Sequence, residues 1–257
     1  MIRDTATFVF RPPPALAYAA RVLIKPCAPV AQPHPVTTSR QTLETVIAGI
    51  RRISDADIIL LEGTPQGEPV NPIYRALGYD FPRLLTLDVR DCIPVEVENP
   101  LPKPWAISTF WLPNVVLSCD YLITVAPFKV VKGKGLFSIY NLLGLLPHNK
   151  YKGNDQRWAD SLYELGIERV IADLYFTMPF DLGIVDARSK LVGDEEFAPQ
   201  QTEDYGKIFL ADPFTADREA AADAGVEVGY LKLIEESRTL LQLRETSNTE
   251  IQLYGSA

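Results

Sequence analysis

The chain has 257 residues, of which 47% are hydrophobic and 23% charged, and its formal net charge is −8 at pH 7. This length and apolar content exclude a disordered protein and allow a full hydrophobic core, and no apolar run approaches the roughly eighteen residues of a membrane span. The net acidity argues against nucleic-acid binding, which needs clustered basic charge.

The first ninety residues alternate between strand-like and helix-like segments. A buried strand is expected at 21–26, a helix capped by Thr37, Thr38 or Ser39 follows, and further segments are a strand at 57–63, a helix at 70–78 and a strand at 84–88. Such alternation is typical of a parallel sheet with helical crossovers.

The remainder continues this pattern after one interruption. Residues 93–117 are proline-rich and β-prone, which predicts a β-hairpin insertion. Beyond it we expect a strand at 120–127, a glycine- and lysine-rich loop, a helix at 136–146, a helix at 156–174, strands at 180–187 and 206–213, helices at 214–225 and 228–244, and a polar tail at 245–257. The prediction is one α/β domain over residues 1–257, with a mostly parallel, Rossmann-like sheet and helices on both faces.

Ionisable residues follow six of the predicted strands, at the sheet edge where open α/β folds bind ligands. They are Lys25, Glu62, Asp88, Lys129, Asp186 and Asp212. For any one of them, capping of a following helix or placement on the surface is the simpler interpretation. For the set, a shared cleft is favoured, because buried lysines and acids need partners.

A basic segment lies in the middle of the chain, since residues 121–154 contain five lysines and no acid. Within it, Gly133 and Gly135 are expected just before a helix, where backbone N–H groups bind anions, and Lys129, Lys132 and Lys134 add positive charge. A flexible, solvated basic loop is an equally good interpretation of the same spacing.

Cysteines, histidines and acids give weaker signals. The three cysteines, Cys27, Cys92 and Cys119, are far apart, so neither a disulfide framework nor an intrinsic iron–sulfur cluster is expected. Cys27 lies two residues from Lys25, whose ammonium would favour a thiolate, although an inert buried thiol is the commoner case. No metal site is assigned to His34 or His148, and a divalent ion held by Glu62, Asp88, Asp186 and Asp212 is only weakly indicated.

Several segments together resemble the family called domain of unknown function 362, which is sometimes joined to ferredoxin-type iron–sulfur modules. The similar segments span about residues 21–235 in family order: KPC followed by PHPVTTS, Glu62-Gly63, CDYLITVAPFKVVKGKGLFSIYNLLG, IVDARSKLVGDEEF and LADPFTADREA. The resemblance implies an α/β fold and a site formed by the matching residues Lys25, Glu62, Lys129, Asn141, Asp186, Asp212 and Asp217.

The chain departs from the family pattern at several of these places. Cys27 replaces an asparagine, Tyr140 replaces a lysine, Ala187 replaces a glycine, and the histidine after the lysines is missing. If those family residues carry chemistry, this member has altered or lost it.

The first functional hypothesis is a cytoplasmic small-molecule enzyme that binds an anionic metabolite in a cleft at the strand C-termini. Lys25, Lys129, Asn141 and the 132–135 loop would bind the anion, and Glu62, Asp186 and Asp212 would act as acid, base or metal ligands. The family's iron–sulfur association implies redox chemistry with electrons from a partner protein. The second hypothesis is a non-catalytic ligand-binding or accessory subunit of an iron–sulfur or redox system.

Overall fold

The computed structural model describes residues 2–152, 158–198 and 201–254. The strands are β1 (Ile2–Asp4), β2 (Arg21–Pro26), β3 (Asp57–Glu62), β4 (Leu84–Asp88), β5 (Pro94–Glu98), β6 (Thr109–Pro113), β7 (Tyr121–Val131), β8 (Lys134–Leu136), β9 (Leu182–Gly193) and β10 (Gln201–Ala211). The α-helices are α1 (Arg40–Arg51), α2 (Val70–Ala76), α3 (Asn114–Leu117), α4 (His148–Tyr151), α5 (Trp158–Glu164), α6 (Ile167–Thr177), α7 (Pro213–Ala224) and α8 (Gly229–Tyr254), and a 3₁₀ helix, η4, covers Tyr140–Leu145.

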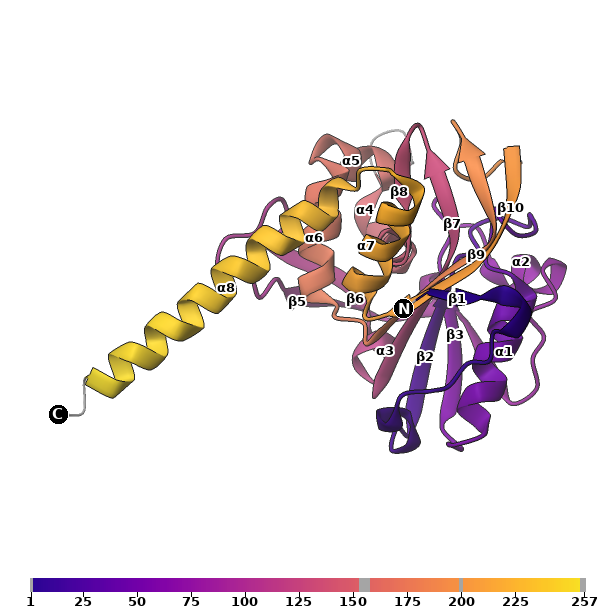
Figure 1. The fold of residues 1–257 in the computed structure, drawn as a ribbon, viewed down its shortest axis with the longest axis horizontal. Helices are drawn as coiled ribbons and strands as arrows, with labels where there is room; N and C mark the ends of the chain where they lie inside the picture. The colour runs from indigo at the N-terminus through magenta and orange to yellow at the C-terminus, as the bar shows by residue number, and fades with distance from the viewer. Residues whose placement is uncertain (1, 153–157, 199–200, 255–257) are drawn as a thin grey trace.

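A mixed, mostly parallel sheet forms the centre of the molecule, with the strand order β1-β10-β9-β7-β2-β3-β4 (Figure 1). The pairs from β9 through β7, β2 and β3 to β4 are all parallel, and β1 and β10 add an antiparallel edge. This arrangement confirms the predicted fold class.

Helices cover both faces of the sheet because its central strands are apolar on both sides. In β2, Val22 and Ile24 belong to the hydrophobic cluster that includes residues of α1 and α2, whereas Leu23 belongs to the cluster that includes residues of η4, α6 and α8. Successive side chains of a strand point to opposite faces, so one short apolar run serves both layers. Figure 1 shows α1 and α2 on one side of the sheet and α6, α7 and α8 on the other.

The predicted hairpin insertion is confirmed. Strands β5 and β6 form a separate antiparallel sheet in which Pro94 lies opposite Pro113.

The N-terminus of α1 is also as expected, since the Ser39 side chain accepts a hydrogen bond of 3.0 Å from the Thr42 N–H.

The predicted order of loop and helix after residue 127 is wrong. Strand β7 continues to Val131, and Lys132 and Gly133, with φ of 50° and 74°, turn the chain into β8. Two successive residues with positive φ match the twist of a tight hairpin, so the glycine serves this turn and does not precede a helix. The helix expected at 136–146 is the shorter 3₁₀ helix η4.

Two helix boundaries also differ from the prediction. The helix expected at 156–174 is two helices, α5 and α6, separated at Gly166, whose φ is 87°; its first two residues lie outside the described part. The expected tail from residue 245 belongs to α8 as far as Tyr254, and residues 255–257 lie outside the described part.

In the described part of the chain, no helix is both long and apolar enough to cross a membrane.

Candidate functional site

A cavity of about 80 Å³ lies where β2, β3 and β7 carry their polar residues. Three of the six predicted strand-end residues line it, namely Lys25, Glu62 and Lys129. We call it the strand-end cavity. A volume of this size accommodates a few water molecules or a small group of non-hydrogen atoms.

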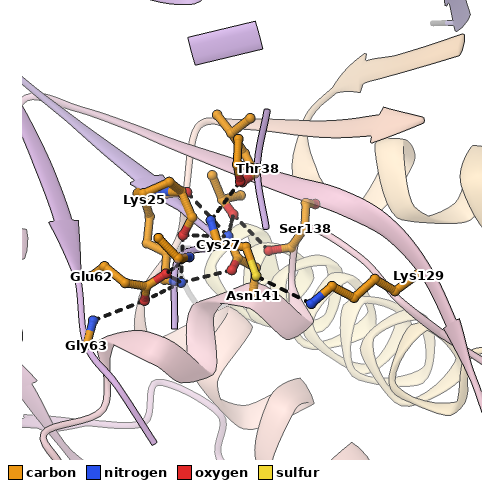
Figure 2. Close-up of polar contacts among 12 residues, drawn as sticks. Lys25, Cys27, Thr38, Glu62, Gly63, Lys129, Ser138 and Asn141 are labelled. Carbon is orange, nitrogen blue, oxygen red and sulfur yellow. Dashed lines mark hydrogen bonds and ion pairs between the residues drawn. The ribbon is translucent and has the colours of Figure 1, made fainter. Parts of the chain in front are cut away.

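Lys25 and Glu62 form a buried ion pair at one side of this cavity (Figure 2). The Lys25 Nζ lies 2.7 Å from Oε1 and 2.9 Å from Oε2 of Glu62, and both side chains are almost fully buried. Glu62 also accepts hydrogen bonds from the backbone N–H groups of Ala28 and Gly63. Burial raises the pKa of Glu62 above its usual value, and the Lys25 ammonium opposes this shift.

Asn141 completes the surroundings of Lys25. Its Oδ1 accepts a hydrogen bond of 2.9 Å from Lys25 Nζ, and its Nδ2 donates to the Lys25 and Pro26 carbonyls and to Thr124 Oγ1. Because Lys25 Nζ also donates to the Pro26 carbonyl, the ammonium is satisfied by the protein itself. Asn141 therefore helps to position Lys25 at the edge of the strand-end cavity.

Lys129 is the second buried lysine, 2% exposed, and its partners are different. Its Nζ donates to the Cys27 sulfur at 3.7 Å and to the Glu196 backbone carbonyl at 3.2 Å, and it lies 5.0 Å from the centre of the Phe197 ring. Among the described residues, no carboxylate lies within ion-pair distance of Lys129. Lys129 lines the strand-end cavity, and Figure 2 shows its ammonium beside Cys27. The charge of the Glu196 carboxylate acts on Lys129 from beyond ion-pair distance.

Cys27 lies between the two lysines, on the cavity wall. Its burial raises the pKa of the thiol above the usual value, and the positive charges of Lys129 and Lys25 only partly oppose this shift. The expected ammonium is therefore present, but desolvation outweighs it and the protonated thiol is favoured.

Tyr140 and Glu196 form a third polar group on the wall, which the strand-end pattern did not identify. Tyr140 OH donates a hydrogen bond of 2.8 Å to Glu196 Oε2 and lies 3.2 Å from the Tyr163 hydroxyl. Burial raises the pKa of both Glu196 and Tyr140. Glu196 follows β9 in a loop, where neither periodicity nor strand ends mark it; its one sequence signal is membership of a segment that matches the family pattern.

Two of the four strand-end acids instead cap local structure, as the simpler interpretation holds. Asp212 is half exposed, and its Oδ1 accepts from the Thr215 N–H at the start of α7. Asp88 is buried and accepts from the N–H groups of Val70 and Arg90. Neither lines the strand-end cavity.

Asp186 lies in a different buried cluster. Its carboxylate accepts from the Arg188 N–H and lies 4.0 Å from His34 Nδ1, while its Oδ2 has no hydrogen-bond partner among the described residues. The His34 Nε2 accepts from the Ser189 N–H, which places the ring proton on Nδ1, facing the Thr37 carbonyl. Burial lowers the pKa of His34, and the Asp186 charge partly opposes this shift.

Asp217, one of the residues matched to the family pattern, supports the backbone below the cavity. It is fully buried and accepts hydrogen bonds from the N–H groups of Ser138 and Ile139, from Ser138 Oγ, and from the Tyr230 hydroxyl. Burial raises its pKa to about 6 although all four bonds oppose this shift. The structure gives Asp217 a role in positioning the segment that leads into η4.

Residues 132–135, at the turn from β7 into β8, do not line the strand-end cavity. Lys132, Gly133 and Lys134 are exposed, Gly135 is buried, and Lys134 Nζ pairs with Glu168 Oε1 at 2.8 Å. Across the described part of the chain, no group of three or more histidines, cysteines and acids is arranged to hold a metal ion.

Comparison with known proteins identifies similar solved structures and a family. One of the structures is the lactate racemase apoprotein from Thermoanaerobacterium thermosaccharolyticum, with a TM-score of 0.54 and 14% sequence identity over 85% of this chain. The match covers 53% of that protein, so this chain spans about half its length. At this identity, the likeness shows the fold alone.

No curated protein matches the sequence. The model of the family described as "Domain of unknown function (DUF362)" matches residues 22–222, which is most of the chain and includes β2 through most of α7. The chain therefore belongs to the DUF362 family.

Proposed function

We propose that this protein is a small-molecule enzyme that binds the carboxylate, or a similar anionic group, of a metabolite at Lys129 in the strand-end cavity. One observation carries the proposal: Lys129 Nζ is buried at the cavity wall with a thiol and a backbone carbonyl as its partners and without a carboxylate at ion-pair distance in the described structure. A buried ammonium is costly without a counter-charge in contact, and the Glu196 carboxylate acts on Lys129 only from beyond ion-pair distance. An anionic ligand at Lys129 therefore gains both charge pairing and hydrogen bonds.

The groups around Lys129 support acid–base chemistry on such a ligand. The raised pKa values of the Cys27 thiol and the Tyr140 hydroxyl keep both groups protonated near neutral pH, so both can donate hydrogen bonds to a bound anion. The raised pKa of Glu196 brings that carboxyl closer to neutral pH, where a general base or acid works best. These three groups replace Asp186 and Asp212 in the proposed mechanism, because those two acids lie away from the cavity.

A redox reaction remains a form of the same proposal, with electrons supplied by a separate protein. Its support is the resemblance to a family that accompanies iron–sulfur modules. The likeness to a protein called lactate racemase suggests a first probe, since lactate is a small carboxylate.

Isothermal titration calorimetry tests the proposal with acetate, D-lactate, L-lactate and phosphate as probes. At least one probe is expected to bind the wild type, and Lys129→Met to lose about tenfold or more in affinity, the value of a charge-assisted hydrogen bond. Lys103→Met is the matched control, because its side chain is exposed and does not line the cavity. Equal affinity of all three proteins, or no binding by any probe, would refute the proposal.

The alternative is a non-catalytic ligand-binding or accessory subunit, and the burial of the Cys27 thiol is the observation that favours it. Proton NMR of a bound carboxylate in D₂O, with and without a reduced electron carrier, separates the two. Loss of substrate or exchange of its carbon-bound protons supports the enzyme. Lys129-dependent binding without any change in the ligand supports the accessory subunit.

A further inference from the structure

A second, larger cavity adjoins the strand-end cavity. Its volume is about 390 Å³. Five residues line both cavities, which makes them neighbours across one wall: Leu136, Tyr140, Tyr163, Ile167 and Glu196. We call the second one the outer cavity.

The shared wall contains the Tyr140–Glu196 hydrogen bond. Tyr140 comes from η4 and Glu196 from the segment after β9, and their contact of 2.8 Å lies between the two spaces. Tyr163 of α5 extends this contact through its own hydroxyl, 3.2 Å from that of Tyr140. Two side chains in contact can move apart by changing rotamers, whereas a wall of packed backbone cannot.

The outer cavity has a chemical character different from that of the strand-end cavity. Its walls include apolar surfaces from Ile167, Ile171 and Val228. The charged residues of its lining are two lysines and three acids: Lys132, Lys134, Glu168, Asp194 and Glu196. Lys134 and Glu168 neutralise each other in an ion pair of 2.8 Å. Apolar walls without an excess of positive charge favour an uncharged, hydrophobic group over a second anion.

We propose that the two cavities form one site for an amphipathic carboxylic acid. The carboxylate occupies the strand-end cavity at Lys129, and an alkyl or aryl substituent passes the Tyr140–Glu196 contact into the outer cavity. This inference rests on the function proposed above and adds the substrate class. The volumes support it, because the strand-end cavity holds little more than the anionic group, while the outer cavity holds a chain of several carbon atoms.

The test compares acetate, hexanoate and 3-phenylpropionate by calorimetry. These acids share one carboxylate and differ in apolar substituent. The wild type is expected to bind hexanoate and 3-phenylpropionate about tenfold or more tightly than acetate, because each buried methylene adds to affinity. Lys129→Met is expected to weaken all three acids.

Val228→Trp fills the outer cavity and is the decisive variant, since Val228 lines that cavity alone. It is expected to reduce the advantage of the longer acids to less than about threefold while acetate binds as in the wild type. Glu227→Trp is the matched control, because Glu227 is exposed and lines neither cavity. Asp194→Trp, at an exposed position of the outer cavity, gives a second way to fill it should Val228→Trp fail to fold.

The outcomes are distinguishable. Binding of acetate without a gain for the longer acids overturns the inference and leaves the proposed function standing. A gain that survives both tryptophan variants also overturns it, because the substituent then lies elsewhere. No binding by any of the acids overturns the proposed function and the inference together.

Discussion

Two buried lysines line the strand-end cavity, and their ammonium groups have different partners. Lys25 has the Glu62 carboxylate, the Asn141 amide and a backbone carbonyl around its ammonium, whereas Lys129 has a thiol and a carbonyl. The first arrangement is complete without a ligand, and the second leaves a positive charge without a carboxylate at contact distance among the described residues. The same residue type, in the same kind of place on neighbouring strands, therefore completes an ion pair in one case and, in the function that we propose, binds a ligand in the other.

Replacing Lys25 is expected to destabilise the fold. Lys25→Met leaves Glu62 buried without its counter-ion, and we expect the free energy of unfolding to fall by about 3–5 kcal/mol, measured by urea denaturation. The double variant Lys25→Met with Glu62→Gln should recover part of this loss, because no charge is then left unpaired. A Lys25→Met protein with wild-type stability would show that Lys25 contributes to ligand binding alone.

Asp217 and Asp212 form a matched pair for testing structural carboxylates. Asp217→Asn places an amide N–H group against donors that now meet a carboxylate oxygen, so we expect the free energy of unfolding to fall by about 2–4 kcal/mol. Asp212→Asn should cost less than about 0.5 kcal/mol, because asparagine caps a helix as well as aspartate does. Equal effects of the two substitutions would contradict the positioning role of Asp217.

His34 gives the protein an acid-side loss of stability. The pKa of His34 is lowered in the folded protein, so the unfolded chain binds the proton more readily. The contribution of neutral His34 to the free energy of unfolding is therefore present above the ordinary pKa of 6.5 and is lost as the pH falls below it. The difference in unfolding free energy between wild type and His34→Gln should therefore shrink from pH 7.5 to pH 5.5. Urea denaturation of both proteins at the two pH values measures this, and a difference that stays constant would contradict the burial of an uncharged His34.

At the level of elements, η4 approaches the Lys25–Glu62 pair unusually closely. A Cβ atom added to Gly144 would lie 2.4 Å from Glu62 Oε1 and 2.7 Å from Lys25 Nζ. Glycine is thus required for contact between η4 and the ends of β2 and β3, and its backbone φ is not the reason.

Gly144→Ala is expected to lower the free energy of unfolding by about 1–3 kcal/mol, as overpacking of a filled core does. Urea denaturation measures this change. Gly133→Ala is the comparison, because a Cβ atom there would have open space around it and only the positive φ would oppose it, at about 1 kcal/mol. A Gly144→Ala protein as stable as the wild type would mean that η4 is not held against the ion pair.

The elements that the sequence predicted correctly are those with local causes. Ser39 caps α1 with its own side chain, and the apolar runs of β2 and β3 are buried on both faces. The hairpin at Lys132 and Gly133 was missed because the turn depends on β7 continuing past Pro127 to pair with β9, which is a long-range contact. The break at Gly166 was missed for a similar reason, since a single glycine inside a helical pattern does not fix where the helix ends.

For the whole molecule, the sequence predicted the mostly parallel sheet and the edge at which three polar side chains meet. It could not separate the acids that cap helices from those in the cavity, because Asp88, Asp186 and Asp212 occupy the same pattern position as Glu62. That distinction depends on the partners that each side chain meets in the fold, since Asp88 is the register partner of Glu62 and yet accepts from the N–H groups of Val70 and Arg90. Glu196 was out of reach for the same reason, since only the folded path of its loop brings it to Tyr140.

The C-terminal half of α8 extends away from the sheet and its covering helices (Figure 1). We expect a chain that ends at residue 242 to keep its melting temperature within about 2 °C of the full-length value, because Tyr230, Ile234 and Ser237 supply the buried contacts of this helix nearer its start. Differential scanning calorimetry and sedimentation of both chains check this. A large drop in melting temperature, or a change in the number of chains per particle, would show that the projecting half is buried in an assembly.

The strand-end cavity draws its polar residues from chain positions as far apart as Lys25 and Glu196. An unfolded chain cannot reproduce that arrangement, so any compound that binds there stabilises the native state by mass action, by about 2.7 kcal/mol at a concentration one hundred times its dissociation constant. Collections of small acids can thus be ranked by the melting temperature of the protein before any reaction is known. The Lys129→Met protein is the blank, and a shift seen with both proteins identifies a compound that acts elsewhere.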